Sequence, residues 1–125
     1  MTMIPQLPVF KEALDGLSQR HDVLVTNLAN MHTPGYTSRD LDFKSVMLGL
    51  QSANSPLSLA TTDEQHLVPP DGKSPWEKAT FSTQEPVDLR HEMVALSENN
   101  IHYAALVQSL QQQFSRYRMV VREGK

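Results

Sequence analysis

The sequence contains no cysteine among its 125 residues. Disulfide bonds, thiolate nucleophiles and cysteine-ligated zinc are therefore excluded. No stretch approaches the roughly 18 consecutive apolar residues that a membrane-spanning helix needs. The opening residues, MTMIPQLPVFKEALDG, also lack the basic start and apolar run of a signal peptide. We therefore expect a chain that is cytoplasmic or is exported without a cleaved signal.

Aromatic residues and basic blocks are also scarce. Aromatic residues make up 6% of the chain, and Trp76 is the single tryptophan, so an apolar core would depend on leucine, valine and methionine. The net charge is −3, and no block of lysine or arginine is present. Because phosphate binding requires a basic stripe, we expect no nucleic-acid partner. The length suits one domain and is short for two.

The residue patterns of catalytic and metal sites are incomplete. His91 and Glu92 begin an HExxH zinc motif, but Ala95 occupies the position of the second histidine. No two histidines are four residues apart in a predicted helix. Asp40 and Asp42 form an acidic pair without a third acid close by. We therefore expect no catalytic residue, no metal site, no cofactor and no small-molecule substrate.

The positions of the eight prolines divide the chain into three parts. They stand at 5, 8, 34, 56, 69, 70, 75 and 86, which leaves 9–33 and 87–125 without proline. Proline is disfavoured inside helices because it lacks an N–H group and clashes with the preceding turn. The sequence thus predicts an N-terminal helix within 1–33, an extended linker or loop over 34–86, and a C-terminal helix over 87–125.

Both proline-free parts have the apolar spacing of a coiled coil, with steps of three and four residues. In the first part, this seam comprises Phe10, Leu14, Leu17, His21, Leu24, Leu28 and Met31. In the second, it comprises Leu89, Met93, Leu96, Asn100, Tyr103, Val107, Leu110, Phe114, Tyr117 and Val121. We therefore predict a mainly α fold, in which the two long helices pair as a coiled coil and form one domain.

Two polar residues, His21 and Asn100, interrupt these apolar series. A polar residue buried in a coiled coil lowers stability but fixes register and partner number. Alternatively, each lies at the partly wet edge of a bent interface, and the sequence does not decide between the two interpretations.

Further apolar residues lie off the predicted seam, and a pair of helices cannot enclose them. They are Leu48, Leu50, Val94, Ala95, Ile101, Leu106 and Val120. We expect neighbouring subunits to cover them and an isolated subunit to be marginally stable, since a two-helix core buries too little surface to offset chain entropy.

The linker over 34–86 is rich in serine, threonine and turn-forming residues. Short strands are expected around Tyr36–Phe43 and Ala79–Ser82, and Asp88 is a suitable N-cap for the second helix. An irregular segment of this length is unusual inside a compact domain. It indicates a segment that is ordered by something outside the subunit or is not ordered.

The stretch VLVTNLANMHTPGYTSRDLDF resembles the N-terminal signature of the flagellar axial proteins, which comprise rod, hook and hook-associated subunits. Their first helix ends in the pattern N-x-A-N-x-x-T-P-G-Y. The residues that match it are Asn27, Ala29, Asn30, Thr33, Pro34, Gly35 and Tyr36. The continuation, which includes Arg39, Asp40 and Phe43, is similar to the proximal rod proteins of this family.

The C-terminal half also resembles the proximal rod proteins. In VDLRHEMVALSENNIHYAALVQSL, the matching positions are Val87, Asp88, Leu89, Glu92, Met93, Glu98, Asn99 and Tyr103. The chain departs from the family before Val87, where STQEP replaces the usual Gly-Asn turn. The two matches cover roughly half of the chain, at both ends and in the expected order.

This resemblance implies a structural subunit of the proximal rod of the bacterial flagellar basal body. Such subunits are exported through the flagellar type III apparatus and polymerise helically in the periplasm, where the rod transmits torque and encloses the export channel. The implied partners are further copies of the chain, other rod proteins, the membrane-ring and adaptor proteins at the rod base, and the export apparatus. The implied role of the segment from Thr33 to Tyr36 is a corner that ends the first helix and turns the chain outward.

Other functions are also compatible with the sequence. Another rod-type axial subunit would share the first signature, although the Arg39–Phe43 run favours the proximal rod protein. A coiled-coil adaptor or an export chaperone would also have two long helices. An enzyme that cuts peptidoglycan would need an acid pair or a metal set, and neither pattern is found.

Overall fold

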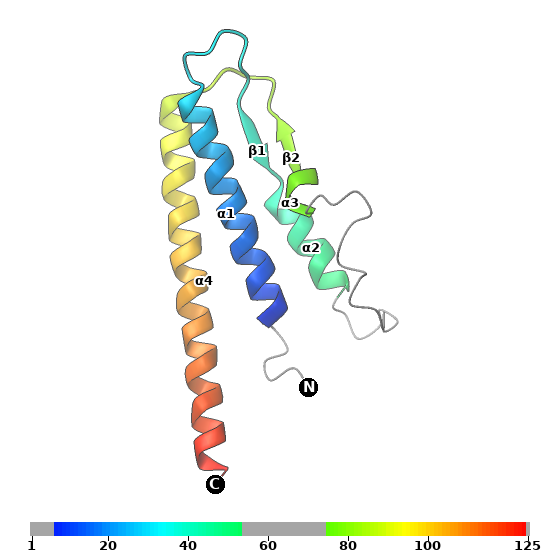
Figure 1. The fold of residues 1–125 in the computed structure, drawn as a ribbon, viewed down its shortest axis with the longest axis vertical. Coiled ribbons are helices and arrows are strands. Elements are labelled where there is room, and N and C mark those ends of the chain that lie inside the picture. Colours follow the sequence, from blue (N-terminus) through cyan, green and yellow to red (C-terminus); the bar gives the residue numbers. More distant parts are fainter. Residues whose placement is uncertain (1–6, 54–74, 125) are drawn as a thin grey trace.

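The computed structural model describes residues 7–53 and 75–124. Its elements are α1 (Leu7–Ala29), β1 (Arg39–Leu41), α2 (Phe43–Ala53), α3 (Pro75–Lys78), β2 (Thr80–Ser82) and α4 (Leu89–Glu123). The long helices α1 and α4 lie side by side and antiparallel, and α1 separates α4 from the strands and α2 (Figure 1). The mainly helical fold with paired N- and C-terminal helices confirms the predicted fold class. No helix in the described ranges combines the length and apolar character needed to cross a membrane.

The fully buried residues of α4 lie on a face that is shifted by one residue from the face that the sequence predicts. Leu17 and Leu24 of α1 are buried, as expected, but on α4 the buried residues are Glu92, Ala95 and Asn99. This face lies one residue before the predicted positions 93, 96 and 100. Ala95 was expected to lie off the seam, and its 4% exposure corrects that prediction. Heptad spacing shows how often apolar residues recur along a helix. Because further apolar residues lie on both sides of this apolar stripe in α4, the spacing does not determine which side of the helix faces α1.

Helix α1 ends at Ala29, before the boundary at 33 that the proline predicts. The N–H of Asn30 donates both to the carbonyl of Thr26 at 3.1 Å and to that of Asn27 at 3.2 Å. The N–H of Met31 then donates to the carbonyl of Leu28 at 3.3 Å. The last turn therefore tightens to three-residue spacing, as is common at helix ends.

Strands β1 and β2 confirm the two short strands expected in the linker. They pair antiparallel, with Asp40 opposite Phe81 at the centre. Further backbone hydrogen bonds extend this pairing, because the N–H of Ser38 donates to the carbonyl of Glu85 at 2.8 Å and that of Asp42 donates to the carbonyl of Ala79 at 3.0 Å. The start and the end of the segment between the helices are thereby held together.

Helix α2 corrects the prediction of an extended linker, since it occupies 11 residues within it. Asp42 caps this helix by accepting a hydrogen bond from the N–H of Ser45 at 3.1 Å. Hydrogen bonds from the side chain and backbone of Ser45 hold the pKa of Asp42 below its ordinary value. The predicted cap of α4 is confirmed, because the Asp88 carboxylate accepts from the N–H of Arg90 at 3.0 Å.

A small aromatic cluster attaches α2 and α3 to α1. Trp76 of α3 is 3% exposed and stacks on Phe43 of α2, with ring centroids 5.3 Å apart. Its indole ring lies so close to Gly16 that a Cβ at this position would be 2.5 Å from the ring. Glycine thus leaves the space on α1 into which the only tryptophan of the chain packs.

Candidate assembly interface and its supporting junction

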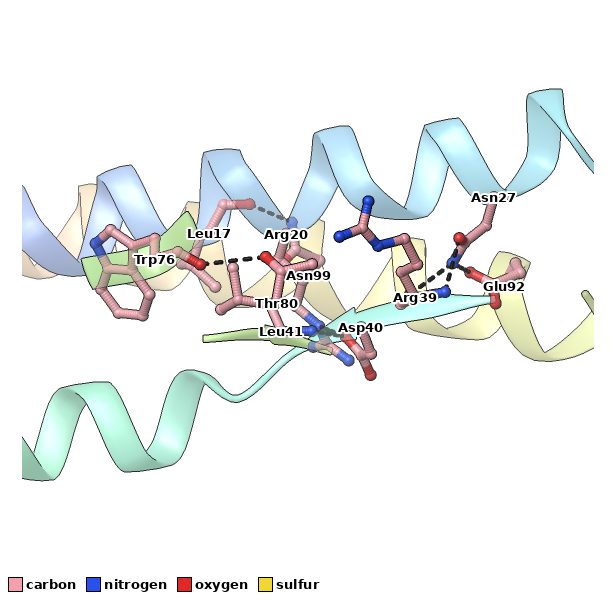
Figure 2. Close-up of polar contacts among 10 residues, drawn as sticks. All are labelled: Leu17, Arg20, Asn27, Arg39, Asp40, Leu41, Trp76, Thr80, Glu92 and Asn99. Carbon is pink, nitrogen blue, oxygen red and sulfur yellow. Dashed lines mark hydrogen bonds and ion pairs between the residues drawn. The ribbon is translucent and has the colours of Figure 1, made fainter. Parts of the chain in front are cut away.

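Asn27, in the last turn of α1, is the centre of a buried polar junction (Figure 2). Its side chain has no solvent exposure. The amide nitrogen donates to the carbonyl of Arg39 at 2.7 Å and to Oε2 of Glu92 at 3.1 Å. The amide oxygen accepts from the N–H of Arg39 at 2.9 Å and from the hydroxyl of Tyr36 at 3.0 Å. One side chain therefore connects α1, the following turn, β1 and α4.

A second buried amide connects the two long helices at a point nearer the beginning of α1. Asn99 of α4 is 2% exposed, and its Nδ2 donates to the backbone carbonyl of Leu17 at 2.9 Å. Sliding α4 along α1 would break both this bond and the one between Asn27 and Glu92, and would leave buried polar groups without partners. These contacts therefore fix the axial position of the helices within the subunit. Asn100, the polar residue that the spacing selects, is exposed.

The Thr33–Tyr36 segment is a turn that lies after the end of α1 at Ala29 and before β1 of the same subunit. A role of this segment in directing the chain toward neighbouring subunits stays a prediction. The N–H of Tyr36 donates to the carbonyl of Thr33 at 3.2 Å, and the hydroxyl of Thr33 donates to Oδ1 of Asn30 at 3.3 Å. Gly35 has a φ of 77°, in the left-handed region that glycine adopts without steric cost. Proline followed by a positive-φ glycine is the pattern of a type II turn. The turn places Tyr36 and Arg39 where Asn27 can bind them.

Valine at position 35 is expected to destabilise the turn by about 1–2 kcal/mol, because a β-branched residue resists the left-handed region. A Cβ there would meet nothing within 4 Å, so the effect arises from the backbone alone. Gly35→Asn serves as the matched control, since asparagine tolerates positive φ. Chemical denaturation should rank the variants in the order glycine, asparagine, valine. Equal stability of the valine and asparagine variants would contradict the role of the turn.

The segment Arg39–Phe43 packs on its own subunit. The guanidinium of Arg20 is 3.2 Å from the carboxylate of Asp40, and both side chains are partly exposed. Leu41 is 5% exposed, and Phe43 stacks on Trp76. The residues that carry the resemblance to the proximal rod proteins therefore fasten β1 and α2 to α1.

The structure brings only part of the predicted seam and corner residues into contact. Asn27 joins Leu17 and Leu24 as buried residues, and the half-buried ones are Leu14, Leu28, Asn30, Tyr36, Asp40, Phe43, Leu96, Val107, Leu110 and Tyr117. The exposed ones are His21, Ala29, Thr33, Pro34, Gly35, Arg39, Met93, Asn100, Tyr103 and Phe114. Within the subunit, the α1–α4 contact does not bury the exposed seam residues. Their participation in contacts between subunits stays a prediction.

The outer surface of α4 carries many apolar side chains that the subunit does not cover. Val94, Ile101, Met119 and Val120 are all between 54% and 68% exposed. Contiguous exposed apolar surface in a protein is typical of an interaction site. In residues 7–53 and 75–124, no group of three or more histidine, aspartate or glutamate side chains could hold a metal ion. The geometry thus offers a surface for association.

Three contacts were not predicted from the sequence, namely Gly16 with Trp76, Asn27 with Glu92, and Leu17 with Asn99. The Gly16–Trp76 contact joins residues 60 positions apart, and only the isolated tryptophan in a polar linker indicates it. Glu92 and Asn99 belong to the C-terminal family signature. The apolar residues next to them follow the helical spacing more closely, so the spacing selects those neighbours as the buried face. A polar residue on the buried face of a helix is not distinguished by spacing alone.

Two antiparallel helices with an uncovered outer face, joined by a buried junction built on N-x-A-N-x-x-T-P-G-Y, define an assembly subunit of the flagellar axial class. No family model matches the chain. It is 31% identical over 125 residues to the flagellar basal body rod protein FlgB of Escherichia coli K12, covering 91% of each chain. It is 29% identical over 121 residues to FlgB of Bacillus subtilis 168, covering 92% of each. A match to FlgB of Salmonella typhimurium LT2 is 29% identical over 104 residues, covering 74% of this chain and 75% of that one.

The chain therefore belongs to the family of the flagellar basal body rod protein FlgB. It is a structural subunit of the proximal rod, and it is not an enzyme. This membership decides against the adaptor, the export chaperone and the peptidoglycan-cutting enzyme. It also selects the proximal rod protein among the axial subunits that share the first signature.

Proposed function

We propose that the subunit polymerises helically, so that its α1–α4 pairs pack around the export channel and the rod transmits torque. The uncovered apolar face of α4 carries this proposal. Val94 and Ile101 are 54% and 66% exposed, although they lie in the same helix as the fully packed Ala95. A surface of this kind is covered when subunits associate, and burial of apolar area drives that association.

The partners that we propose are further copies of the chain, other rod proteins, and the membrane-ring and adaptor proteins at the rod base. The subunit reaches the periplasm through the flagellar export apparatus without a cleaved signal. The buried junction supports contacts between subunits through α4, because Asn27, Tyr36 and Arg39 hold the small sheet to one side of α1. The outer face of α4 is thereby left free for neighbouring subunits.

Replacing Leu110 by aspartate is expected to abolish rod assembly. Leu110 is half-buried on α4, and a carboxylate without a partner costs several kcal/mol when it is buried. The matched control is Gln112→Asp, which places the same charge two residues away on an exposed position of α4. Basal bodies are purified from strains that carry either variant as the only copy, and the rods are counted by electron microscopy.

The proposal predicts few or no rods with Leu110→Asp and a normal number with Gln112→Asp. Export of each variant is measured in parallel by its amount outside the cytoplasm. Normal rods with both variants would overturn the proposed packing of α4. Motility on soft agar gives a second readout of the same comparison.

A further inference from the structure

The last turns of α4 carry an open apolar groove, which we call the C-terminal groove. Its lining comprises Gln111, Phe114, Ser115, Tyr117, Arg118 and Val121. Phe114 is 42% exposed and Val121 is 50% exposed. This part of α4 extends past the described beginning of α1 at Leu7 (Figure 1). The described part of α1 therefore leaves the groove uncovered.

The C-terminal groove continues the side of α4 that packs on α1. Asn99 is buried, and its amide donates to the carbonyl of Leu17 in α1. Tyr117 follows Asn99 by 18 residues, which is about five full turns at roughly 3.6 residues per turn, so the two residues share one side of α4. Phe114 and Val121 lie three residues before and four residues after Tyr117, and therefore on the same side. Since this side of α4 already binds one helix, its continuation has the shape to bind another.

The charge at the C-terminal groove is positive. Its lining holds Arg118 and no acid. Arg122 lies four residues further along, on the same side of the helix as Arg118. In the described part of the chain, neither guanidinium forms an ion pair. Residues 108–124 hold three arginines and a single acid, Glu123. A partner that covers the groove can therefore supply acids beside the two arginines.

We propose that the C-terminal groove binds a helix of a different protein, in which an apolar stripe is flanked by aspartate or glutamate. This inference rests on the proposed function, because it describes a surface through which the subunit contacts another protein of the rod or of its base. Apolar residues of the partner cover Phe114 and Val121, and its carboxylates face Arg118 and Arg122. Opposite charges at the border of an apolar contact favour the correct partner and oppose others.

This chain does not itself offer a matching acidic helix face. The C-terminal groove of a second copy carries the same arginine. Another open apolar groove, in the first turns of α4, is lined by Arg90 as well as by Asp88 and Glu98. The residues before Leu7, MTMIPQ, contain no acid. A second copy and the beginning of the chain therefore complement the groove less well than an acidic helix does.

A membrane surface also fits the groove less well than a helix does. A helix that lies on a bilayer presents one broad apolar face and a basic polar face. In the C-terminal groove, Gln111 and Ser115 lie beside the apolar residues, so the apolar strip is narrow. Met119 and Val120 are also exposed, but they do not line the groove. The width of the strip thus suits a single helix.

Reversing the charge of Arg118 tests this inference. The Arg118→Glu variant is produced as the only copy of the chain in an otherwise normal strain, and the rods in purified basal bodies are counted by electron microscopy. Arg116→Glu is the matched control, because it makes the same charge change two residues away, outside the groove. Arg118→Lys keeps the positive charge. Both arginines are exposed, so all three variants should keep the helical circular dichroism of the natural chain.

We expect the number of rods to fall by about tenfold or more with Arg118→Glu, because like charges at a contact oppose binding. Arg116→Glu and Arg118→Lys should give normal numbers. Normal rods with Arg118→Glu would overturn this inference and leave the proposed function standing, since Leu110→Asp tests assembly separately. Equal losses with Arg118→Glu and Arg116→Glu would also overturn it, because the effect would then not depend on the groove.

Second-site changes that restore motility to the Arg118→Glu strain identify the occupant. The inference predicts changes in a different basal-body protein that replace an aspartate or glutamate by a neutral or basic residue. Restoring changes within this chain would overturn it in favour of a second copy or of the beginning of the chain. The purified chain is also mixed with vesicles of phosphatidylcholine and phosphatidylglycerol. Cosedimentation that Arg118→Glu abolishes would overturn the inference in favour of a membrane surface.

Discussion

Replacing Asn27 by leucine is expected to lower the free energy of unfolding by about 3–5 kcal/mol, because a buried carboxylate then loses its hydrogen-bond donor. Leucine has a similar volume but cannot bind the backbone of Arg39 or the carboxylate of Glu92, which is 2% exposed. Urea denaturation of the purified chain, followed by far-UV circular dichroism, measures the change. A subunit of marginal stability should lose most of its helical signal before any urea is added.

The control for this prediction is Asn30→Ala, in the turn just after α1. The amide of Asn30 donates to the carbonyl of Thr26 at 2.9 Å in an exposed position, so its loss should cost less than about 1 kcal/mol. The double variant Asn27→Leu with Glu92→Leu removes both buried polar groups and should recover part of the stability. Equal effects of Asn27→Leu and Asn30→Ala would show that the junction does not hold the helices together.

Replacing Gly16 by valine is expected to displace Trp76 from α1. The first added atom would already lie 2.5 Å from the indole ring, which is closer than non-bonded carbon atoms approach. Because the ring is stacked on Phe43, its displacement disturbs α2 and α3 together. We expect a loss of about 2–3 kcal/mol, as overpacking of a tight core produces.

The fluorescence of Trp76 measures this displacement directly, since the chain has no other tryptophan. The emission of the native chain should be that of a buried indole and should shift to longer wavelength in Gly16→Val. Ser18→Ala, at an exposed position on α1, is the control and should leave the spectrum unchanged. An unshifted spectrum in Gly16→Val would contradict the packing of α3 on α1.

The elements that the sequence predicts correctly are those that local chemistry determines. The prolines delimit α1 and α4, and Asp88 caps α4 as expected. The strands follow from short extended segments between turn formers. Helix α2 was missed because its 11 residues are bordered by polar, turn-rich sequence. Its cap, Asp42, was interpreted as part of an acidic pair in a loop.

The contacts that the sequence does not reveal are those between distant segments. The interaction of Asn27 with Glu92 spans 65 positions, and that of Asn99 with Leu17 spans 82. No periodic pattern encodes which polar residue of a helix is buried against its partner. The family signature indicated Asn27 as part of a motif, but its four hydrogen bonds emerge only when α1, β1 and α4 are brought together.

Density maps of purified basal bodies test the central claim that this chain is a proximal rod subunit whose paired helices are covered by neighbouring copies. The measurement compares rods from a strain that carries the chain with basal bodies from a strain that lacks it. The account predicts an antiparallel α1–α4 pair at the proximal end of the rod, with the outer face of α4 in contact with the next subunits, and no rod in the strain that lacks the chain. Complete rods in the absence of the chain, or an α4 face open to solvent in the assembled rod, would contradict it.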